Sequence, residues 1–359
     1  MKRNLNNGNR SWIRVSALAL LFAFSSIVAF AFDNPMVGAS RFGVTLSGPE
    51  FGQKQMPGVY GKDYIYPSEK EVAYYASKNI NKFHLPVRWE RIQRKLGGAL
   101  DAIEVKRIKD FLNVCDKYDA SVIINIQNYG RYTLNGVEVR LGSDTVTNAN
   151  FRDLWKKMAA AFNSHPAVIG FNLMAEPHDL GTGKWFAAAQ EAINGIREIS
   201  SKQLILVDGD SWANAANWEK HSDILKNLVD PANKIVYNAH IYFDADHSGS
   251  YANSNDPNKK DKNIGVKKAM QFVEWLKKNN KIGYFGEFGI PSNDADWFPV
   301  LNNFLEYINK NNISASSWGA GPWWGNYPLS IEPVNNQDKP QLVAILKYAN
   351  NNNAIVAKN

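Results

Sequence analysis

Short apolar runs alternate with longer segments of helical period along most of this chain of 359 residues. The eight runs are residues 41–48, 81–87, 121–128, 167–176, 204–210, 234–243, 282–289 and 313–321. Between them, apolar residues recur at spacings of three and four, as in residues 102–118 and 266–280, which is typical of amphipathic helices. Strands that alternate with helices pair in parallel and are covered on both faces. Eight such units predict a protein of the α/β class that folds as a closed (β/α)8 barrel, the TIM barrel.

An open, doubly wound sheet is the alternative arrangement of the same units. That fold commonly carries a Gly-x-Gly-x-x-Gly turn after its first strand, and no such turn follows residues 41–48. The sequence also shows no linker, internal repeat or low-complexity segment. We therefore expect a single barrel domain.

The N-terminal segment has the three parts of a secretory signal peptide. Its basic residues are Lys2, Arg3, Arg10 and Arg14. An apolar run over residues 15–32 follows them and contains the small-x-small pattern Ala29-Phe30-Ala31. This order predicts a signal peptide over residues 1–31, a mature barrel domain over residues 32–359, and secretion to the periplasm or the medium. The alternative is an uncleaved membrane anchor, because the run is nearly long enough to span a bilayer.

Charge and cysteine content exclude other classes of protein. The formal net charge is +7, and the four basic residues of the N-terminal segment supply +4 of it, which leaves +3 for the rest of the chain. So small a surplus does not indicate a nucleic-acid partner. Cys115 is the only cysteine, so the chain cannot form an internal disulfide, and we expect Cys115 to pack as a small apolar residue.

Polar and aromatic residues gather at the carboxyl ends of the predicted strands, where TIM barrels carry their active sites. These residues are His84, Gln127, Asn128, Glu176, Asp210, His240, Tyr242, Glu287 and Trp318. Glu176 and Glu287 end the fourth and seventh runs, so they should face each other across one mouth. Cleavage of a glycosidic bond requires two carboxyl groups, one protonated and one ionised. The pattern therefore indicates a glycosidase.

Other chemistries lack their sequence signatures. The six histidines show no metal-ligand spacing, and we expect neither a metal nor a cofactor. Residues 244–249 imitate the start of an EF-hand loop, but its twelfth position is Asn255 rather than Glu, so we interpret the segment as a polar loop. No Gly-x-Ser-x-Gly elbow or Walker loop occurs, which argues against acyl and phosphoryl transfer.

Five stretches in the same order resemble glycoside hydrolase family 5, the large family of retaining cellulases. They are FHLPVRWER, INIQNYGRY, FNLMAEPHD, HIYFDADHSG and GEFG. The resemblance runs from Gly43 to Pro333 and implies a (β/α)8 barrel that hydrolyses a β-linked polysaccharide. It implies that Glu176 is the proton donor and general acid/base and that Glu287 is the nucleophile. His240 and Tyr242 would then line the cleavage subsite, with Tyr242 orienting the Glu287 carboxylate.

The same resemblance assigns residues to sugar binding. Asn128 would stand near the reacting sugar, and Trp318 would form the platform under the sugar at the scissile bond. Trp212 is a candidate for a flanking subsite. Trp323 and Trp324 either line the cleft or pack at the rim of the barrel.

Three residues depart from the family pattern near the two glutamates. Ala175 replaces the Asn that precedes the acid/base and that contacts the sugar 2-hydroxyl in the family. His84 replaces an Arg of the second strand, and Gln127 replaces a His of the third. A neutral His84 would hold the charge of the nucleophile less well than an arginine. Loss of the Asn side chain at Ala175 would also open space for a substituent at C2 of the sugar.

We expect a secreted, retaining endo-β-1,4-glucanase (a cellulase) that acts as a monomer on β-glucan, without a nucleic-acid partner or stable membrane association. One alternative is hydrolysis of another β-linked polysaccharide, such as mannan or mixed-linkage glucan. The other is a weakly active or non-catalytic carbohydrate-binding barrel, which the three departures motivate.

Overall fold

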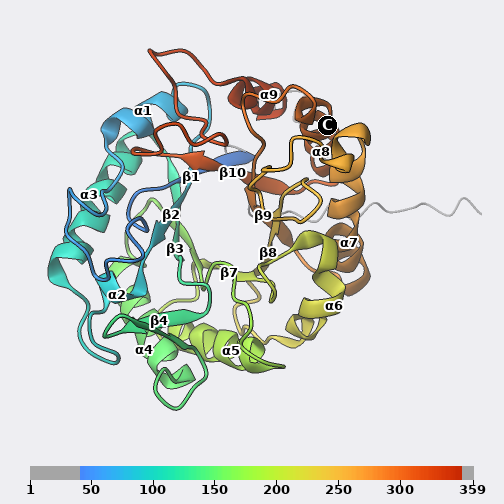
Figure 1. Cartoon of the computed structure of the whole chain (residues 1–359). Coiled ribbons are helices and arrows are strands. Elements are labelled where there is room, and N and C mark those ends of the chain that lie inside the picture. The colour runs from blue at the N-terminus through green and yellow to red at the C-terminus, as the bar shows by residue number, and fades with distance from the viewer. Residues whose placement is uncertain (1–40, 350–359) are drawn as a thin grey trace, which may run out of the picture. The chain divides into compact units, whose positions relative to one another are not determined.

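A closed barrel of eight parallel strands forms the centre of the structure (Figure 1), a computed structural model that describes residues 41–349. The predicted signal peptide over residues 1–31 lies outside the described residues. The barrel strands are β1 (Phe42–Leu46), β2 (Lys82–Val87), β3 (Ser121–Ile126), β6 (Val168–Asn172), β7 (Leu204–Asp208), β8 (Ile235–Ile241), β9 (Gly283–Phe288) and β10 (Ser314–Ala320). Each lies within one of the eight apolar runs, and their order around the barrel is β1-β10-β9-β8-β7-β6-β3-β2. The predicted (β/α)8 barrel is confirmed.

Helices surround the ring of strands (Figure 1). They are α1 (Glu69–Ala76), α2 (Trp89–Ile92), α3 (Ala102–Lys117), α4 (Asn148–Phe162), α5 (Lys184–Arg197), α6 (Trp218–Ser222), α7 (Ile264–Asn279), α8 (Trp297–Lys310) and α9 (Pro340–Ala349). Short 3₁₀ turns lie at Ala215–Asn217, Asp223–Asn227 and Pro257–Lys260.

Helix α3 shows how the local sequence sets these elements. The Asp101 side chain accepts hydrogen bonds from the backbone N–H groups of Ile103 and Glu104, which satisfies donors that the first helical turn leaves free. The apolar face of α3, including Cys115, is buried against the barrel. Burial raises the pKa of the Cys115 thiol, in keeping with an inert, packed side chain.

Buried polar side chains occupy alternate positions at the carboxyl ends of four neighbouring strands. They are Asn125 on β3, Gln127 directly after β3, Asn172 on β6, Asp208 on β7, and Asn238 and His240 on β8. Hydrogen bonds connect neighbouring strands, from Asn172 Nδ2 to Asn125 Oδ1 at 2.9 Å and from Asn238 Nδ2 to Asp208 Oδ1 at 2.7 Å. Because side chains alternate along a strand, these polar groups face the barrel interior together. They form the floor of the candidate site.

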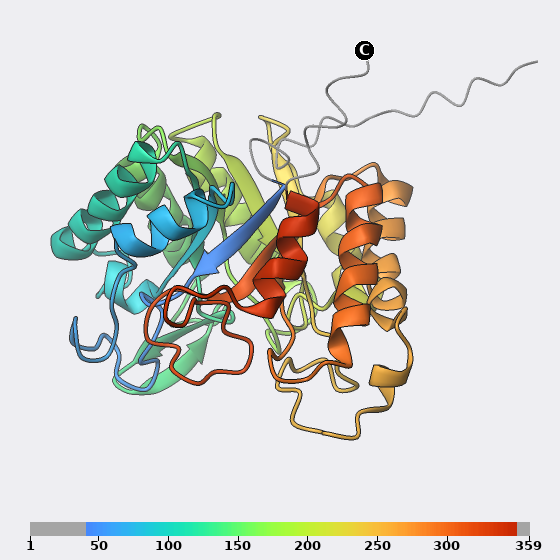
Figure 2. The same cartoon turned by 90° about the horizontal axis from the view of Figure 1, so that it is seen from above.

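A small antiparallel hairpin, β4 (Arg131–Leu134) and β5 (Val137–Arg140), follows β3 and was not anticipated from the sequence. Its turn is Asn135-Gly136, with φ angles of 51° and 80°, the backbone that a two-residue hairpin turn requires. Figure 2 shows the hairpin at the end of the barrel where the blue, orange and red loops after β1, β8 and β10 also lie. Among the helices of residues 41–349, none is both long enough and apolar enough to cross a membrane.

Candidate active site

Glu176 lies four residues beyond the end of β6, in a tight turn rather than on the strand itself. Its φ of 50° is left-handed, a conformation that costs free energy for a residue with a Cβ atom. The turn is held because the Glu176 N–H donates a hydrogen bond to Asp208 Oδ2 at 3.0 Å. The chain thereby directs the Glu176 carboxyl across the mouth of the barrel.

Glu287 lies within β9 and is only 6% exposed. The Tyr242 hydroxyl donates to Glu287 Oε2 at 3.1 Å, and the Gln127 amide donates to Oε1 at 3.5 Å. Each carboxyl oxygen therefore faces a hydrogen-bond donor, which favours the ionised form that a nucleophile needs.

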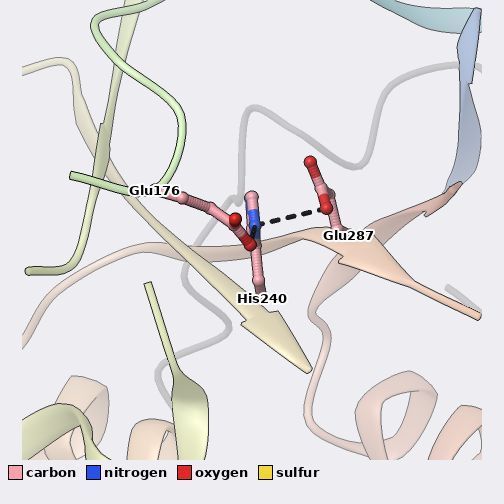
Figure 3. A group of neighbouring side chains, drawn as sticks. All are labelled: Glu176, His240 and Glu287. Atoms are coloured by element: carbon pink, nitrogen blue, oxygen red, sulfur yellow. Dashed lines mark hydrogen bonds and ion pairs between the residues drawn. The ribbon is translucent and has the colours of Figure 1, made fainter. Parts of the chain in front are cut away.

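The imidazole ring of His240 lies between the two glutamates (Figure 3). Its Nδ1 atom is 2.8 Å from Glu176 Oε1 and 3.5 Å from Glu287 Oε2, and its Nε2 atom is 3.3 Å from Asp208 Oδ2. One oxygen atom of each glutamate and one nitrogen of the ring lie within 4.8 Å of one another. The two carboxyl groups are thus close enough to act on the same bond.

Burial and the neighbouring charges shift the pKa values of this cluster. Burial lowers the pKa of His240, but the carboxylates of Glu287, Asp208 and Glu176 outweigh burial and raise it to about 10. Burial also raises the pKa of Glu287 above its ordinary 4.5, against the opposing effect of His240, and the nearby Glu176 adds to the rise. Two carboxyl groups this close do not both ionise readily. The pair therefore keeps one proton at neutral pH, beside a positively charged ring.

Asp208 is the buried counter-ion of that ring. It is fully buried, which raises the pKa of its carboxyl to about 6, and the positive His240 and donated hydrogen bonds oppose the rise. The sequence analysis singled out Asp210 at this strand end instead. Asp210 accepts a hydrogen bond from the Ser211 N–H and borders a separate hollow with Asp179 and His221. Alternation along the strand cannot choose between positions 208 and 210, because both have the same parity. Asp208 is the last residue of β7, whereas Asp210 lies two residues beyond it.

Glu176, His240 and Glu287 are also the group among residues 41–349 whose spacing would suit a metal ion. A histidine must be neutral to bind a metal ion, whereas the pKa of His240 is raised to about 10. The donor set therefore suits a proton-sharing cluster better than a cation site.

The residues expected to replace the family's Arg and His lie beside the cluster, His84 near His240 and Gln127 against Glu287. His84 is buried, and burial together with the positive His240 lowers its pKa to about 3, so this ring stays neutral. Its Nε2 atom has no hydrogen-bond partner among the described residues. Gln127 Oε1 accepts a hydrogen bond from Asn125 Nδ2 at 2.6 Å, which makes the Gln127 amide nitrogen the atom that faces Glu287 Oε1.

Ala175 presents no accessible surface. Its N–H donates to the Ile126 carbonyl at 2.8 Å, and its carbonyl accepts from the Tyr129 N–H at 3.1 Å. The structure therefore shows no open space at Ala175 for a substituent on the sugar.

Asn128 is turned away from the two glutamates. Its Nδ2 atom donates to Glu90 Oε2 at 2.7 Å, and its Oδ1 atom accepts from the Trp89 N–H at 2.8 Å. Both ends of the amide thus hold the start of α2, and the side chain is buried. In this structure Asn128 supports the wall of the site.

Trp212 lies on the Glu176 side of the site and is 48% exposed. Its ring stacks on His178 with 3.5 Å between centroids and lies 5.9 Å from Tyr129. It borders a cavity of about 360 Å³ whose lining residues are Glu176, Trp212, Asn214, His240, Tyr242, Asp246, His247 and Ser248. An exposed ring beside the proposed proton donor suits the face of a sugar.

Trp318 lies half-buried at the end of β10, within a second aromatic group. The Trp318 and Trp324 rings are 5.5 Å apart, and Trp324 stacks on Tyr327 at 4.6 Å and meets Phe51 at 4.9 Å. Trp324 therefore belongs to the wall that carries Trp318. Trp323 is 48% exposed.

A sequence model of the family described as Cellulase (glycosyl hydrolase family 5) matches residues 44–323. Endo-β-1,4-glucanase B of Emericella nidulans is 34% identical over 327 residues, which cover 90% of this chain and 95% of that protein. The crystal structure of Pseudomonas stutzeri endoglucanase Cel5A with cellobiose has a TM-score of 0.81 and 36% identity, covering 86% of this chain and 92% of that one. An endo-β-1,4-glucanase from Xanthomonas axonopodis pv. citri gives a TM-score of 0.79 and 37% identity, covering 86% and 98%.

Proposed function

Because the chain belongs to glycoside hydrolase family 5, we propose that this glycoside hydrolase is an endo-β-1,4-glucanase that cleaves β-glucan with retention of anomeric configuration. The similar proteins named endo-β-1,4-glucanases, and the cellobiose bound by one similar structure, support this choice of substrate. We further propose that residues 1–31 export the enzyme and that it acts as a monomer outside the cytoplasm.

The observation that carries the mechanism is the separation of the two carboxyl groups. Retaining glycosidases hold them about 5–5.5 Å apart, whereas inverting enzymes leave about 6.5–9.5 Å for a water molecule. Here the facing oxygen atoms of Glu176 and Glu287 lie within 4.8 Å of each other. This spacing supports direct attack by a carboxylate on the sugar.

In the first step, a Glu287 oxygen attacks the anomeric carbon while Glu176 donates its proton to the departing glycosidic oxygen. The bond to the leaving sugar breaks and a covalent glycosyl–enzyme ester forms. In the second step, Glu176 accepts a proton from water, and the water oxygen attacks the same carbon. Glu287 is released as a carboxylate, and the product regains the β configuration.

His240 and Tyr242 prepare this proton arrangement. The charged His240 ring, in contact with both carboxyl groups, stabilises the single negative charge that the pair carries. The Tyr242 hydroxyl holds Glu287 Oε2 and so leaves the carboxylate in a fixed orientation. The donors Tyr242 and Gln127 are both aimed at Glu287, which favours an enzyme over a barrel that only binds sugar.

The test is release of reducing sugar by the wild type and by Glu287→Gln on a panel of soluble β-1,4-glucan, mannan and mixed-linkage glucan. We expect turnover of β-1,4-glucan by the wild type alone, with both proteins binding the polymer. Higher turnover of mannan than of β-1,4-glucan would show that the proposed substrate is wrong and that mannan is the better one. Binding without turnover of any polymer would contradict the proposed enzyme and support a carbohydrate-binding barrel instead.

A further inference from the structure

Gly249 packs its backbone against the ring of Tyr242. A Cβ atom at Gly249 would lie 2.6 Å from Tyr242 Cδ1 and 2.8 Å from Cε1, far inside van der Waals contact. Gly249 also has a φ of +69°, which glycine adopts without strain. The loop after β8 therefore supports the ring at a distance that only glycine permits.

The side chain of Asp244 closes this loop. Its Oδ1 atom accepts from the Gly249 N–H at 3.2 Å, and its Oδ2 atom accepts from the Tyr251 N–H at 3.1 Å. The Lys268 ammonium group of α7 is buried beneath the loop and donates to the carbonyls of Tyr242 at 3.0 Å and Asp244 at 2.5 Å. The polar loop that imitates an EF-hand is thus closed by backbone N–H groups and a lysine.

Tyr251, at the end of the same loop, links the two strands that carry the site. Its hydroxyl accepts from the Phe243 N–H at 3.1 Å and donates to the Gly289 carbonyl at 2.6 Å. Phe243 follows Tyr242, and Gly289 lies two residues after Glu287. The hydroxyl therefore fixes the end of β8 relative to the end of β9.

We propose that Gly249 is a positioning residue for the reaction, which holds the Tyr242 hydroxyl on Glu287 by supporting the Tyr242 ring. This inference rests on the proposed role of Glu287 as nucleophile. A Cβ atom at position 249 moves the ring, so Glu287 Oε2 loses its donor. Because that hydrogen bond lowers the pKa of Glu287, its loss raises the pKa further and reduces the fraction of reactive carboxylate.

The experiment compares Gly249→Ala with Gly61→Ala, each alone and with Tyr242→Phe. Gly61 has a φ of +78° and no atom within 4 Å of a Cβ at that position, so it measures the cost of the backbone conformation by itself. We expect Gly249→Ala to lower kcat/KM by about tenfold or more, as loss of a hydrogen bond to a charged group does, and to move the ascending limb of its pH profile upward. In the Tyr242→Phe background, the same change should add nothing.

Equal effects of Gly249→Ala and Gly61→Ala, or a full additional loss in the Tyr242→Phe background, overturn the inference while the proposed function stands. Tyr251→Phe adds no bulk and provides a second variant. Like Gly249→Ala it should lower kcat, again only when Tyr242 is present. A crystal structure of Gly249→Ala decides the placement without any turnover. A Tyr242 hydroxyl still bonded to Glu287 would contradict the inference.

Discussion

The Nδ1 atom of His240 lies 2.8 Å from Glu176 Oε1, so the carboxyl group proposed as proton donor is in contact with a positively charged ring. The same ring is 3.5 Å from the proposed nucleophile Glu287 and 3.3 Å from the buried Asp208. One positively charged ring thus contacts three carboxyl groups. The proposed reaction requires a proton on Glu176 and a negative charge on Glu287.

Replacing the proton donor should separate natural from activated substrates. Glu176→Gln is expected to abolish cleavage of β-1,4-glucan, because the departing sugar oxygen needs a proton. Aryl glycosides with a good leaving group need none, so their first step should proceed. Steady-state kinetics on both substrates provides the measurement, and equal losses on both would remove the acid role from Glu176.

The pH profile should reflect the raised pKa of Glu287. The nucleophile reacts as a carboxylate, so kcat/KM rises as pH increases through its pKa. Burial raises that pKa above the ordinary 4.5, so the ascending limb should lie at higher pH than that of an exposed carboxyl group. A limb near the ordinary value would contradict the electrostatics of the cluster.

His84→Arg should move the same limb in the opposite direction. Arginine would add a positive charge near His240 and Glu287 where His84 is neutral, and an added cation lowers the pKa of a carboxyl group. The limb of kcat/KM against pH should therefore shift to lower pH. His84→Gln keeps position 84 uncharged and is the matched control. For this variant we expect no shift of the ascending limb of kcat/KM.

Asp208 should contribute strongly to folding as well as to the site. Asp208→Asn removes the buried counter-ion of His240 and an acceptor of the Glu176 N–H, and loss of one partner of a buried ion pair costs about 3 kcal/mol or more. Denaturant unfolding at neutral pH measures the free energy of unfolding. Asp210→Asn lies outside this network and should change it by about 0.5 kcal/mol or less. Similar values for the two variants would exclude the proposed role of Asp208.

The mature N-terminus tests the predicted export signal. In a bacterial host, the exported protein should begin at Phe32, because cleavage is expected after Ala31. N-terminal sequencing or intact-mass measurement distinguishes this product from membrane-bound chain that still carries Met1, which would indicate an anchor.

The barrel could be predicted from the sequence because the apolar character of each strand and the helical spacing of apolar residues between strands are local properties. All eight apolar runs contain a barrel strand, and the facing positions of Glu176 and Glu287 follow from the fold. The β4–β5 hairpin was missed although Asn135-Gly136 is a strong turn signal. Its short strands lack the apolar character that identified the others.

Contacts between segments distant in sequence could not be anticipated in the same way. Asp208 and Asp210 are both plausible at the end of one run, and only the inward direction of the side chain distinguishes them. Asn128 lies in a motif of the family, yet its amide holds Trp89 and Glu90. The support of Tyr242 by Gly249 depends on the path of a loop, which no periodicity encodes.

The most direct test of the proposed mechanism is covalent capture of the nucleophile. A 2-fluoro glycoside with a good leaving group forms the glycosyl–enzyme ester but slows its hydrolysis, so the ester accumulates. Peptide mapping by mass spectrometry should place the label on Glu287, and the first product from a β-linked substrate should have the β configuration. A label on another residue, or a first product of α configuration, would contradict the assignment of Glu287 as the nucleophile of a retaining enzyme.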